Sequence, residues 1–392
     1  MTEKKYSLDE IRVRLNELDD ELLRLLSERR KMSIEVAKSK VKTSKPVRDA
    51  NREQQLLVKL INSGRDLYEL DAQYITKLFH TIIEDSVLLQ QSYLQNLANP
   101  ELSRKPLSRV AFLGSKGSYS YLASHEYFSR KNIDLIELNC EHFKEVTQTV
   151  ESGHADYGVL PIENTSSGSI NEVYDLLQHT TLYIVGELTL PIEHCLVATN
   201  ELRLEDIKTL YSHPQPHQQC SEFLSRMKGV VLESCSSTAD AMKKVKEMNR
   251  NDVAAIGNAS SGKLYGLQSI QGNIANQTEN HTRFIVVARK PVEVSTQIPA
   301  KTTLIMSTSQ EAGALVSTLL VLQKYNININ KLESRPIMGN PWEEMFYVDL
   351  ESHIESNEMQ LALNELTQLT KHLKILGCYP SENVKPTNVK LQ

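Results

Sequence analysis

A cation interrupts a leucine-rich seam near the start of the sequence. In heptad positions, one line of the seam holds Leu8, Leu15, Leu22, Arg29 and Val36, and the other holds Ile11, Leu18, Leu25 and Met32. A helix with so regular an apolar seam packs against another helix, and a charge in the seam costs free energy unless it is paired. Arg29 therefore either specifies the register of the packed helices or binds an anion.

The spacing of the neighbouring cations constrains the anion. At about 1.5 Å of rise per residue, Lys40 lies about 16 Å from Arg29 along the helix, and Arg12 lies about 25 Å from Arg29. Arg29 and Lys40 can lean towards one small molecule, but Arg12 reaches it only from a second, antiparallel copy of the helix. The sequence therefore predicts an intertwined dimer whose two-fold axis passes near Leu22 and Leu23.

Two further predicted helices carry polar groups that could complete this site. Asp49, Arg52 and Glu53 share one face of the second helix, and Ser86 and Gln90 lie on the apolar stripe of the third. Polar groups on an apolar stripe need partners. Ordinary surface ion pairs remain the simpler explanation for the group on the second helix taken alone.

Polar motifs also punctuate the middle of the chain. They are GSKGSYSYLA (114–123), ENTSSGSI (163–170), YSHPQPHQQC (211–220) and Thr282-Arg283-Phe284. Binding loops of α/β folds have this character, although helix caps and turns also explain each motif separately. The first motif reads G-x-x-G rather than G-x-G-x-x-G, so we expect no nicotinamide cofactor. His213 and His217 lack companion ligands at suitable spacing, so we expect no metal.

Composition sets the broad class of the protein. The chain has 392 residues, too many for one hydrophobic core, and 40% of them are hydrophobic. It lacks an apolar run that could cross a bilayer, and its net charge of −5 does not favour nucleic acid, although residues 29–52 hold nine basic and two acidic side chains. The five cysteines lack C-x-x-C spacing, which predicts reduced, buried thiols. We expect a soluble, cytoplasmic protein that binds small anions.

Changes in the pattern of apolar and polar residues divide the chain into three predicted domains. Residues 1–98 are predicted to be all-helical, 99–107 to be a linker, and 108–290 to be an α/β domain with a mixed or parallel sheet. A second linker, 291–300, precedes residues 301–385, whose order β-α-β-β-α-β predicts a ferredoxin-like α+β unit.

The helical region resembles the all-helical chorismate mutases. The matching segments are LDEIRVRLNELDDELLRLLSERRKMSIEVAKSK, PVRDANREQ and IIEDSVLLQQ. The resemblance implies that Arg12 of a partner chain, Arg29 and Arg52 hold the two carboxylates of chorismate, that Lys40 and Gln90 face its ether oxygen, and that Asp49, Glu53 and Ser86 complete the pocket. A sigmatropic rearrangement needs a compact substrate conformer and donors at the oxygen that gains charge, and it needs no nucleophile.

The four middle motifs together resemble prephenate dehydratase. That family has two α/β lobes around a cleft, a periplasmic-binding-protein-like architecture. By the resemblance, the cleft would be lined by Asn164, Thr165, Ser166, Ser212, Gln219, Thr282 and Arg283. Thr282 would donate to the departing hydroxyl of prephenate while carbon dioxide leaves. Arg283 could bind a substrate carboxylate or form a structural ion pair, and both interpretations stay open.

The C-terminal unit resembles ACT regulatory domains through GALV at 313–316 and ESRP at 333–336. The resemblance implies phenylalanine binding by Gly313, Ala314, Leu315, Val316, Glu333, Ser334, Arg335 and Pro336. Gly313 would open a helix whose backbone N–H groups can meet a carboxylate. ACT units commonly pair across subunits, which implies a second dimer contact.

The three resemblances occur in the order found in the bifunctional chorismate mutase/prephenate dehydratases, the P-proteins of bacterial phenylalanine synthesis. We therefore predict conversion of chorismate to prephenate and then to phenylpyruvate, with feedback inhibition by L-phenylalanine and without a cofactor. A non-catalytic amino-acid sensor is the alternative from another class. A mutase joined to a prephenate dehydrogenase would need the nicotinamide loop that the first motif lacks.

Overall fold

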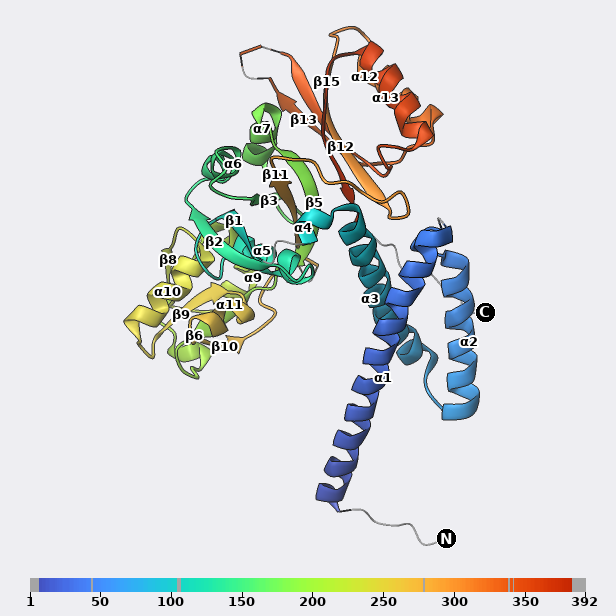
Figure 1. Ribbon diagram of the computed structural model, residues 1–392. Coiled ribbons are helices and arrows are strands. Elements are labelled where there is room, and N and C mark those ends of the chain that lie inside the picture. The colour runs from blue at the N-terminus through green and yellow to red at the C-terminus, as the bar shows by residue number, and fades with distance from the viewer. Residues whose placement is uncertain are drawn as a thin grey trace. The chain divides into compact units, whose positions relative to one another are not determined.

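The computed structural model (Figure 1) describes residues 7–43, 45–103, 107–277, 279–337, 339–340 and 342–382. The chain forms two compact units. The first contains the described residues up to Leu102 together with Val294–Pro299, and the second contains Ser103–Glu293 and Ala300–Glu382. Within these described residues, we find no helix that combines the length and the apolar character needed to cross a membrane.

Three long helices make the body of the first unit: α1 (Leu8–Thr43), α2 (Ala50–Tyr68) and α3 (Ala72–Ala98). A short α4 (Pro100–Ser103) follows at its boundary with the second unit. The side chains of Asp49 and Asp71 cap the N-termini of α2 and α3, which explains where both helices begin. The predicted helical opening is therefore confirmed. The seam of α1 is largely uncovered in the single chain, since Leu8, Leu15 and Leu22 are 63%, 53% and 51% exposed.

The core of this unit includes a segment from far along the sequence. The cluster consists of Val47, Leu57, Ile83, Val87, Leu94 and Ile298. The backbone N–H of Val47 donates to the carbonyl of Gln297, and the Gln297 amide donates to the carbonyls of Lys40 and Lys45 at 2.9 and 2.7 Å. The segment 294–299, expected to be a linker, thus packs beside the end of α1 and the turn that follows it.

The second unit begins with two mixed sheets, here called the first and second lobes. The first sheet has the order β2-β1-β3-β11-β5, with β4 beside β3, and the second has the order β10-β6-β9-β7-β8. The strands of the first lobe are β1 (Leu107–Leu113), β2 (Asp134–Cys140), β3 (Tyr157–Asn164), β4 (Gly168–Ser169), β5 (Tyr183–Pro191) and β11 (His281–Ala288). Those of the second are β6 (Cys195–Ala198), β7 (Thr209–Ser212), β8 (Val231–Ser234), β9 (Val253–Gly257) and β10 (Gln268–Gln271). The predicted α/β class with a mixed sheet is confirmed.

Helices connect the strands of both lobes. Those of the first lobe are α5 (Tyr119–Ser129), α6 (Phe143–Glu151) and α7 (Asn171–His179). Those of the second are α8 (Pro214–Gln219), α9 (Ser221–Leu224), α10 (Thr238–Met248) and α11 (Ala259–Leu264), with a 3-10 turn η1 (Leu204–Asp206). All five cysteines are free and buried, as predicted.

The remaining elements form the C-terminal subdomain, residues 300–382. They are β12 (Ala300–Thr308), α12 (Ala314–Lys324), β13 (Ile329–Pro336), β14 (Glu344–Leu350), α13 (Asn357–Leu369) and β15 (Thr370–Pro380). The sheet order is β13-β14-β12-β15, so the predicted β-α-β-β-α-β order and ferredoxin-like topology are confirmed.

The C-terminal sheet is buried on both faces. Leu304 and Met306 of β12 pack with α12 and α13, whereas Ile305, between them, joins the core of the first lobe. Gly377 of β15 lies so close to β5 that a Cβ atom there would sit 2.1 Å from the Ile184 carbonyl oxygen. The C-terminal sheet and the first lobe therefore share one core.

Candidate functional site

Arg29 meets polar groups of the third helix within the same chain. Its guanidinium donates to the Ser86 hydroxyl and to the Ile82 carbonyl, the latter at 3.1 Å. Burial lowers the pKa of Arg29, although Asp85 nearby opposes that shift. Gln90, one turn along α3, donates to the Ser86 carbonyl at 3.1 Å. Its Oε1 atom is buried without a hydrogen-bond partner in the described part of the chain.

Lys40 lies at the other end of this polar region. Its ammonium group donates to the Val47 carbonyl. Burial lowers the pKa of Lys40, and the carboxylates of Asp49 and Glu53 oppose the shift. The structure therefore brings Lys40 near two residues of the second-helix group. Arg52 remains exposed, and its backbone N–H donates to Asp49 at 3.0 Å.

Arg12 stands apart from these groups within one chain. Its side chain is 67% exposed and pairs with Asp9 at 3.6 Å in the first turn of α1. Because α1 is one continuous helix from Leu8 to Thr43, Arg12 cannot fold back towards Arg29.

In the first lobe, Asn164 and Thr282 form a buried pair where β3 and β11 meet. They are directly opposite in the antiparallel register, and Asn164 Nδ2 donates to Thr282 Oγ1 at 2.9 Å. The Asn164 oxygen accepts from the N–H groups of Ser166 and Ser167 at 3.0 and 2.9 Å. Since Thr282 accepts from Asn164, its own hydroxyl hydrogen is left to point elsewhere. The pair is only 5% and 8% exposed.

The loop after β3 is held from both sides. Thr165 exchanges hydrogen bonds with the backbone of His281, both at 2.9 Å. Ser166 donates to Gln277 at 2.7 Å. Gln215, in the motif at 211–220, donates to the Ser167 hydroxyl at 2.9 Å. The structure thus brings the motif at 163–170 beside both the Thr282 strand and the second lobe.

Ser212 and Gln219 lie on the second lobe at the two ends of that motif. Ser212 is buried and donates to the His213 carbonyl at 2.9 Å. Gln219 Oε1 lies 2.7 Å from Nε2 of the buried His194. Nδ1 of His194 has no hydrogen-bond partner among the described residues, and burial lowers the pKa of this imidazole. A neutral His194 whose Nε2–H donates to Gln219 satisfies this geometry.

Arg283 points away from Thr282, towards the C-terminal subdomain. Its guanidinium donates to Glu187 at 2.8 Å and forms an ion pair with Asp349 of β14 at 2.5 Å. The alternating directions of strand side chains explain why adjacent residues serve opposite faces. Of the two interpretations that the sequence left open, the structural ion pair is the one observed.

The two motifs of the C-terminal subdomain also differ in their surroundings. Gly313 caps α12 with a left-handed φ of +86°, so the predicted helix start is confirmed, and Ala314, Leu315 and Val316 form its first turn. Along β13, Ser334 and Pro336 are exposed. The alternate residues Glu333 and Arg335 bind the first lobe, through Ser169 at 2.6 Å and Asp175 at 2.8 Å.

Comparison with known proteins assigns the family. The family model for chorismate mutase type II matches residues 11–91, and that for prephenate dehydratase matches residues 110–292. A bifunctional chorismate mutase/prephenate dehydratase of Enterobacter agglomerans is 55% identical over 96% of both chains. The chain belongs to this bifunctional family. The homologue of Escherichia coli K12 is 54% identical over 96% of this chain and 97% of its own.

Solved structures resemble the larger part of this bifunctional enzyme. The prephenate dehydratase of Staphylococcus aureus is 28% identical, with a TM-score of 0.61, over 69% of this chain and 99% of its own. A prephenate dehydratase of Arthrobacter aurescens in complex with L-Phe is 26% identical, with a TM-score of 0.63, over 72% and 92%. A quorum-quenching acylase, GqqA, is 29% identical with a TM-score of 0.63 over 70% and 98%. The family match establishes the chorismate mutase and prephenate dehydratase activities, two steps of phenylalanine biosynthesis.

Sequence reasoning missed several residues around these sites. They are Arg48, which binds the buried Glu53 at 3.1 Å, together with Gln215, Gln277, Asn280 and His194. Asn280 accepts from the Asn164 amide at 2.8 Å. Gln215 lay inside a motif already singled out, so its position was a usable signal. Gln277 and Asn280 lie in a polar connection before β11, where local pattern does not indicate the partner.

Proposed function

We propose that the helical unit binds chorismate through the residues that its family resemblance names. Arg29, Arg52 and Arg12 from a second chain would hold the two carboxylates, and Lys40 and Gln90 would face the ether oxygen. The contact between Arg29 and Ser86 and the half-buried position of Lys40 support this assignment. Asp49, Glu53 and Ser86 would orient these cations. Cations held in place before the reaction stabilise the developing charge without reorganising.

A homodimer built on α1 is part of this proposal. The exposed seam from Leu8 to Val36 supports it, because a line of half-exposed leucines on one long helix is suited to a helical partner. A second antiparallel α1 would bury the seam and supply Arg12. Substitution of Leu18, which is 46% exposed, with lysine should give monomers by light scattering and abolish mutase turnover. A fully active monomer would contradict the shared site.

For dehydration, we propose that Thr282 donates to the leaving hydroxyl of prephenate. The observation that carries this assignment is the hydrogen bond from Asn164 to Thr282 Oγ1, which fixes the hydroxyl as an acceptor there and leaves its hydrogen for the substrate. Thr165, Ser166, Ser212 and Gln219 would position prephenate around it. The aromatic ring that forms as carbon dioxide and hydroxide leave supplies the driving force, so positioning and one donor suffice.

We propose that the C-terminal subdomain is an ACT domain that binds L-phenylalanine and inhibits dehydration. Its ferredoxin-like topology and the left-handed Gly313 at the start of α12 support this, as does the L-Phe complex of the Arthrobacter enzyme. The exposed Ser334 and Pro336 would face the ligand together with the first turn of α12. Glu333 and Arg335 would act through the first lobe. The five buried, unpaired thiols support a reducing location such as the cytoplasm.

One experiment tests the combined proposal. The purified chain receives chorismate alone, and prephenate and phenylpyruvate are followed with and without L-phenylalanine. Phenylpyruvate should form and should decrease when phenylalanine is present. Formation that ignores phenylalanine would contradict the regulatory assignment, and failure to consume chorismate would favour the sensor interpretation.

Reciprocal variants test whether the two sites are independent. Lys40→Ala should abolish the mutase reaction and leave dehydration of supplied prephenate intact. Thr282→Ala should do the reverse. Loss of both activities in either variant, with the fold retained by circular dichroism, would contradict independent sites.

A further inference from the structure

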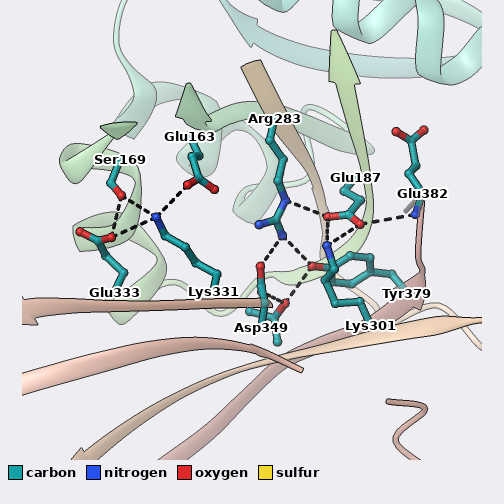
Figure 2. Close-up of polar contacts among 11 residues, drawn as sticks. Glu163, Ser169, Glu187, Arg283, Lys301, Lys331, Glu333, Asp349, Tyr379 and Glu382 are labelled. Carbon is teal, nitrogen blue, oxygen red and sulfur yellow. Dashed lines mark hydrogen bonds and ion pairs between the residues drawn. The ribbon is translucent and has the colours of Figure 1, made fainter. Parts of the chain in front are cut away.

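Glu163 and Arg283 are the strand neighbours of Asn164 and Thr282, and they face the C-terminal subdomain. Asn164 is opposite Thr282 in the β3–β11 register, and Glu163 is opposite Arg283 one position along. Side chains alternate between the two faces of a sheet, so these neighbouring pairs point in opposite directions. Figure 2 shows Glu163 and Arg283 directed at residues of the C-terminal sheet. The pair proposed to meet prephenate and the pair that faces the C-terminal subdomain are thus consecutive cross-strand pairs of β3 and β11. Each such pair is called a rung below.

The Arg283 end of this rung is a buried, charge-balanced cluster. Arg283 binds Glu187 and Asp349, and Lys301 of β12 donates to both Glu187 oxygens at 2.7 and 2.8 Å. Tyr379 of β15 accepts from Arg283 at 3.3 Å. The side chains of Glu187, Asp349 and Lys301 are 3%, 0% and 2% exposed. Charges so deeply buried are restricted to geometries that keep every partner in place.

The Glu163 end is held by Lys331 of β13. Its ammonium group contacts Glu163 at 2.8 Å, Ser169 at 3.0 Å and Glu333 at 3.2 Å. Ser169 in turn donates to Glu333 at 2.6 Å. Lys331 therefore contacts three segments, as Figure 2 shows: β3 through Glu163, the short β4 through Ser169, and the ESRP motif through Glu333.

We propose that Glu163 and Arg283 are positioning residues for Asn164 and Thr282, and that the C-terminal subdomain controls dehydration by moving them through Lys331 and Asp349. A shift of β13 or β14 changes the ion pairs of Glu163 and Arg283. The adjacent rung, Asn164 and Thr282, is the one proposed to meet prephenate. Sub-ångström shifts matter there because a donor must lie within hydrogen-bond distance of the leaving hydroxyl. The inference rests on the proposed inhibition by L-phenylalanine and names the groups that transmit it.

Lys331→Met tests the rung because Lys331 lies outside both proposed phenylalanine-binding motifs. Three properties of the full chain are measured: dehydratase turnover on prephenate with and without saturating L-phenylalanine, mutase turnover, and binding of radiolabelled L-phenylalanine by equilibrium dialysis. We expect phenylalanine still to bind, while the ratio of uninhibited to inhibited dehydratase rate falls by about 5-fold or more. Mutase turnover should remain that of the wild type.

Two matched control variants and one second test variant separate coupling from general damage. Lys331→Arg retains the cation and should restore inhibition. Lys371→Met removes a lysine that pairs at 2.8 Å with Glu343 inside the C-terminal subdomain, and it should behave like the wild type. Tyr379→Phe removes one partner of Arg283 and should weaken inhibition in the same direction as Lys331→Met.

The outcomes distinguish this inference from the proposed function. If Lys331→Met and Tyr379→Phe bind phenylalanine and remain inhibited to the wild-type extent, the rung does not carry the coupling. If Lys331→Met loses phenylalanine binding together with inhibition, Lys331 belongs to the binding site and the inference is overturned. If the wild type itself binds no phenylalanine, the proposed regulatory function fails instead.

Discussion

Truncation of Ile298 should weaken the mutase unit selectively, although this residue lies about 200 positions beyond the last mutase helix. Ile298 is 2% exposed and packs with Val47, Leu57 and Ile83. Its neighbour Gln297 binds the carbonyl of Lys40 at 2.9 Å. The segment between the first lobe and the C-terminal subdomain therefore supports the turn next to a proposed catalytic lysine.

The number of buried carbons that the substitution removes determines the expected loss of stability. Ile298→Ala removes three buried carbons at about 0.8 kcal/mol each, or about 2.4 kcal/mol, and the remaining cavity raises the cost into a range of about 2–5 kcal/mol. At roughly 4 °C per kcal/mol for a domain of this size, the helical unit should unfold about 10 °C lower.

The assay follows both activities of one sample. Portions are heated at a fixed protein concentration, cooled, and assayed separately for mutase and for dehydration of prephenate. Ile298→Ala should lower the temperature of half-inactivation for the mutase, and that for the dehydratase should stay within about 2 °C. Ile136→Ala, at a 43% exposed isoleucine, is the control and should change neither. Equal loss of both activities, or no loss, would refute the reasoning.

Three further predictions concern the second unit. Asn164→Ala should lower dehydratase kcat by about 100-fold because Thr282 loses the donor that orients it, and steady-state kinetics with an unchanged mutase rate would check this. Burial lowers the pKa of His194, so the unfolded chain binds a proton more readily than the folded chain, and the free energy of unfolding should decrease as pH falls below the ordinary value of 6.5. His194→Asn should flatten this pH dependence of the free energy of unfolding in urea, and an unchanged dependence would contradict the prediction. Gly377→Ala should lower the free energy of unfolding by about 1–3 kcal/mol, because its Cβ would meet the Ile184 carbonyl; a variant as stable as the wild type in urea would contradict that contact.

Much of the architecture could be predicted from sequence because it depends on local periodicity. The heptad seam predicted α1, and the order of strands and helices predicted the α/β class of the middle region and the β-α-β-β-α-β unit, whereas the division into two lobes was implied only by the family resemblance. The start of α12 at Gly313 was also predicted, whereas the role of Asp49 as the cap of α2 was not. Side-chain direction was harder. The triplet Thr282-Arg283-Phe284 could not show that Arg283 faces Asp349, because both faces of β11 are covered and neither is marked by polarity.

The segment 294–299 illustrates the physical limit of such reasoning. Its proline, Pro299, and its three polar residues are typical of a linker, and its apolar Val294 and Ile298 are too few to predict a core element by themselves. Burial arises only because helices some 200 residues earlier leave an apolar site between them. A short segment that connects the first lobe to the C-terminal subdomain can thus contribute to the core of the helical unit. Insertion of a flexible Gly-Ser pair on either side of this segment should preserve mutase stability, whereas replacement of the segment itself should not.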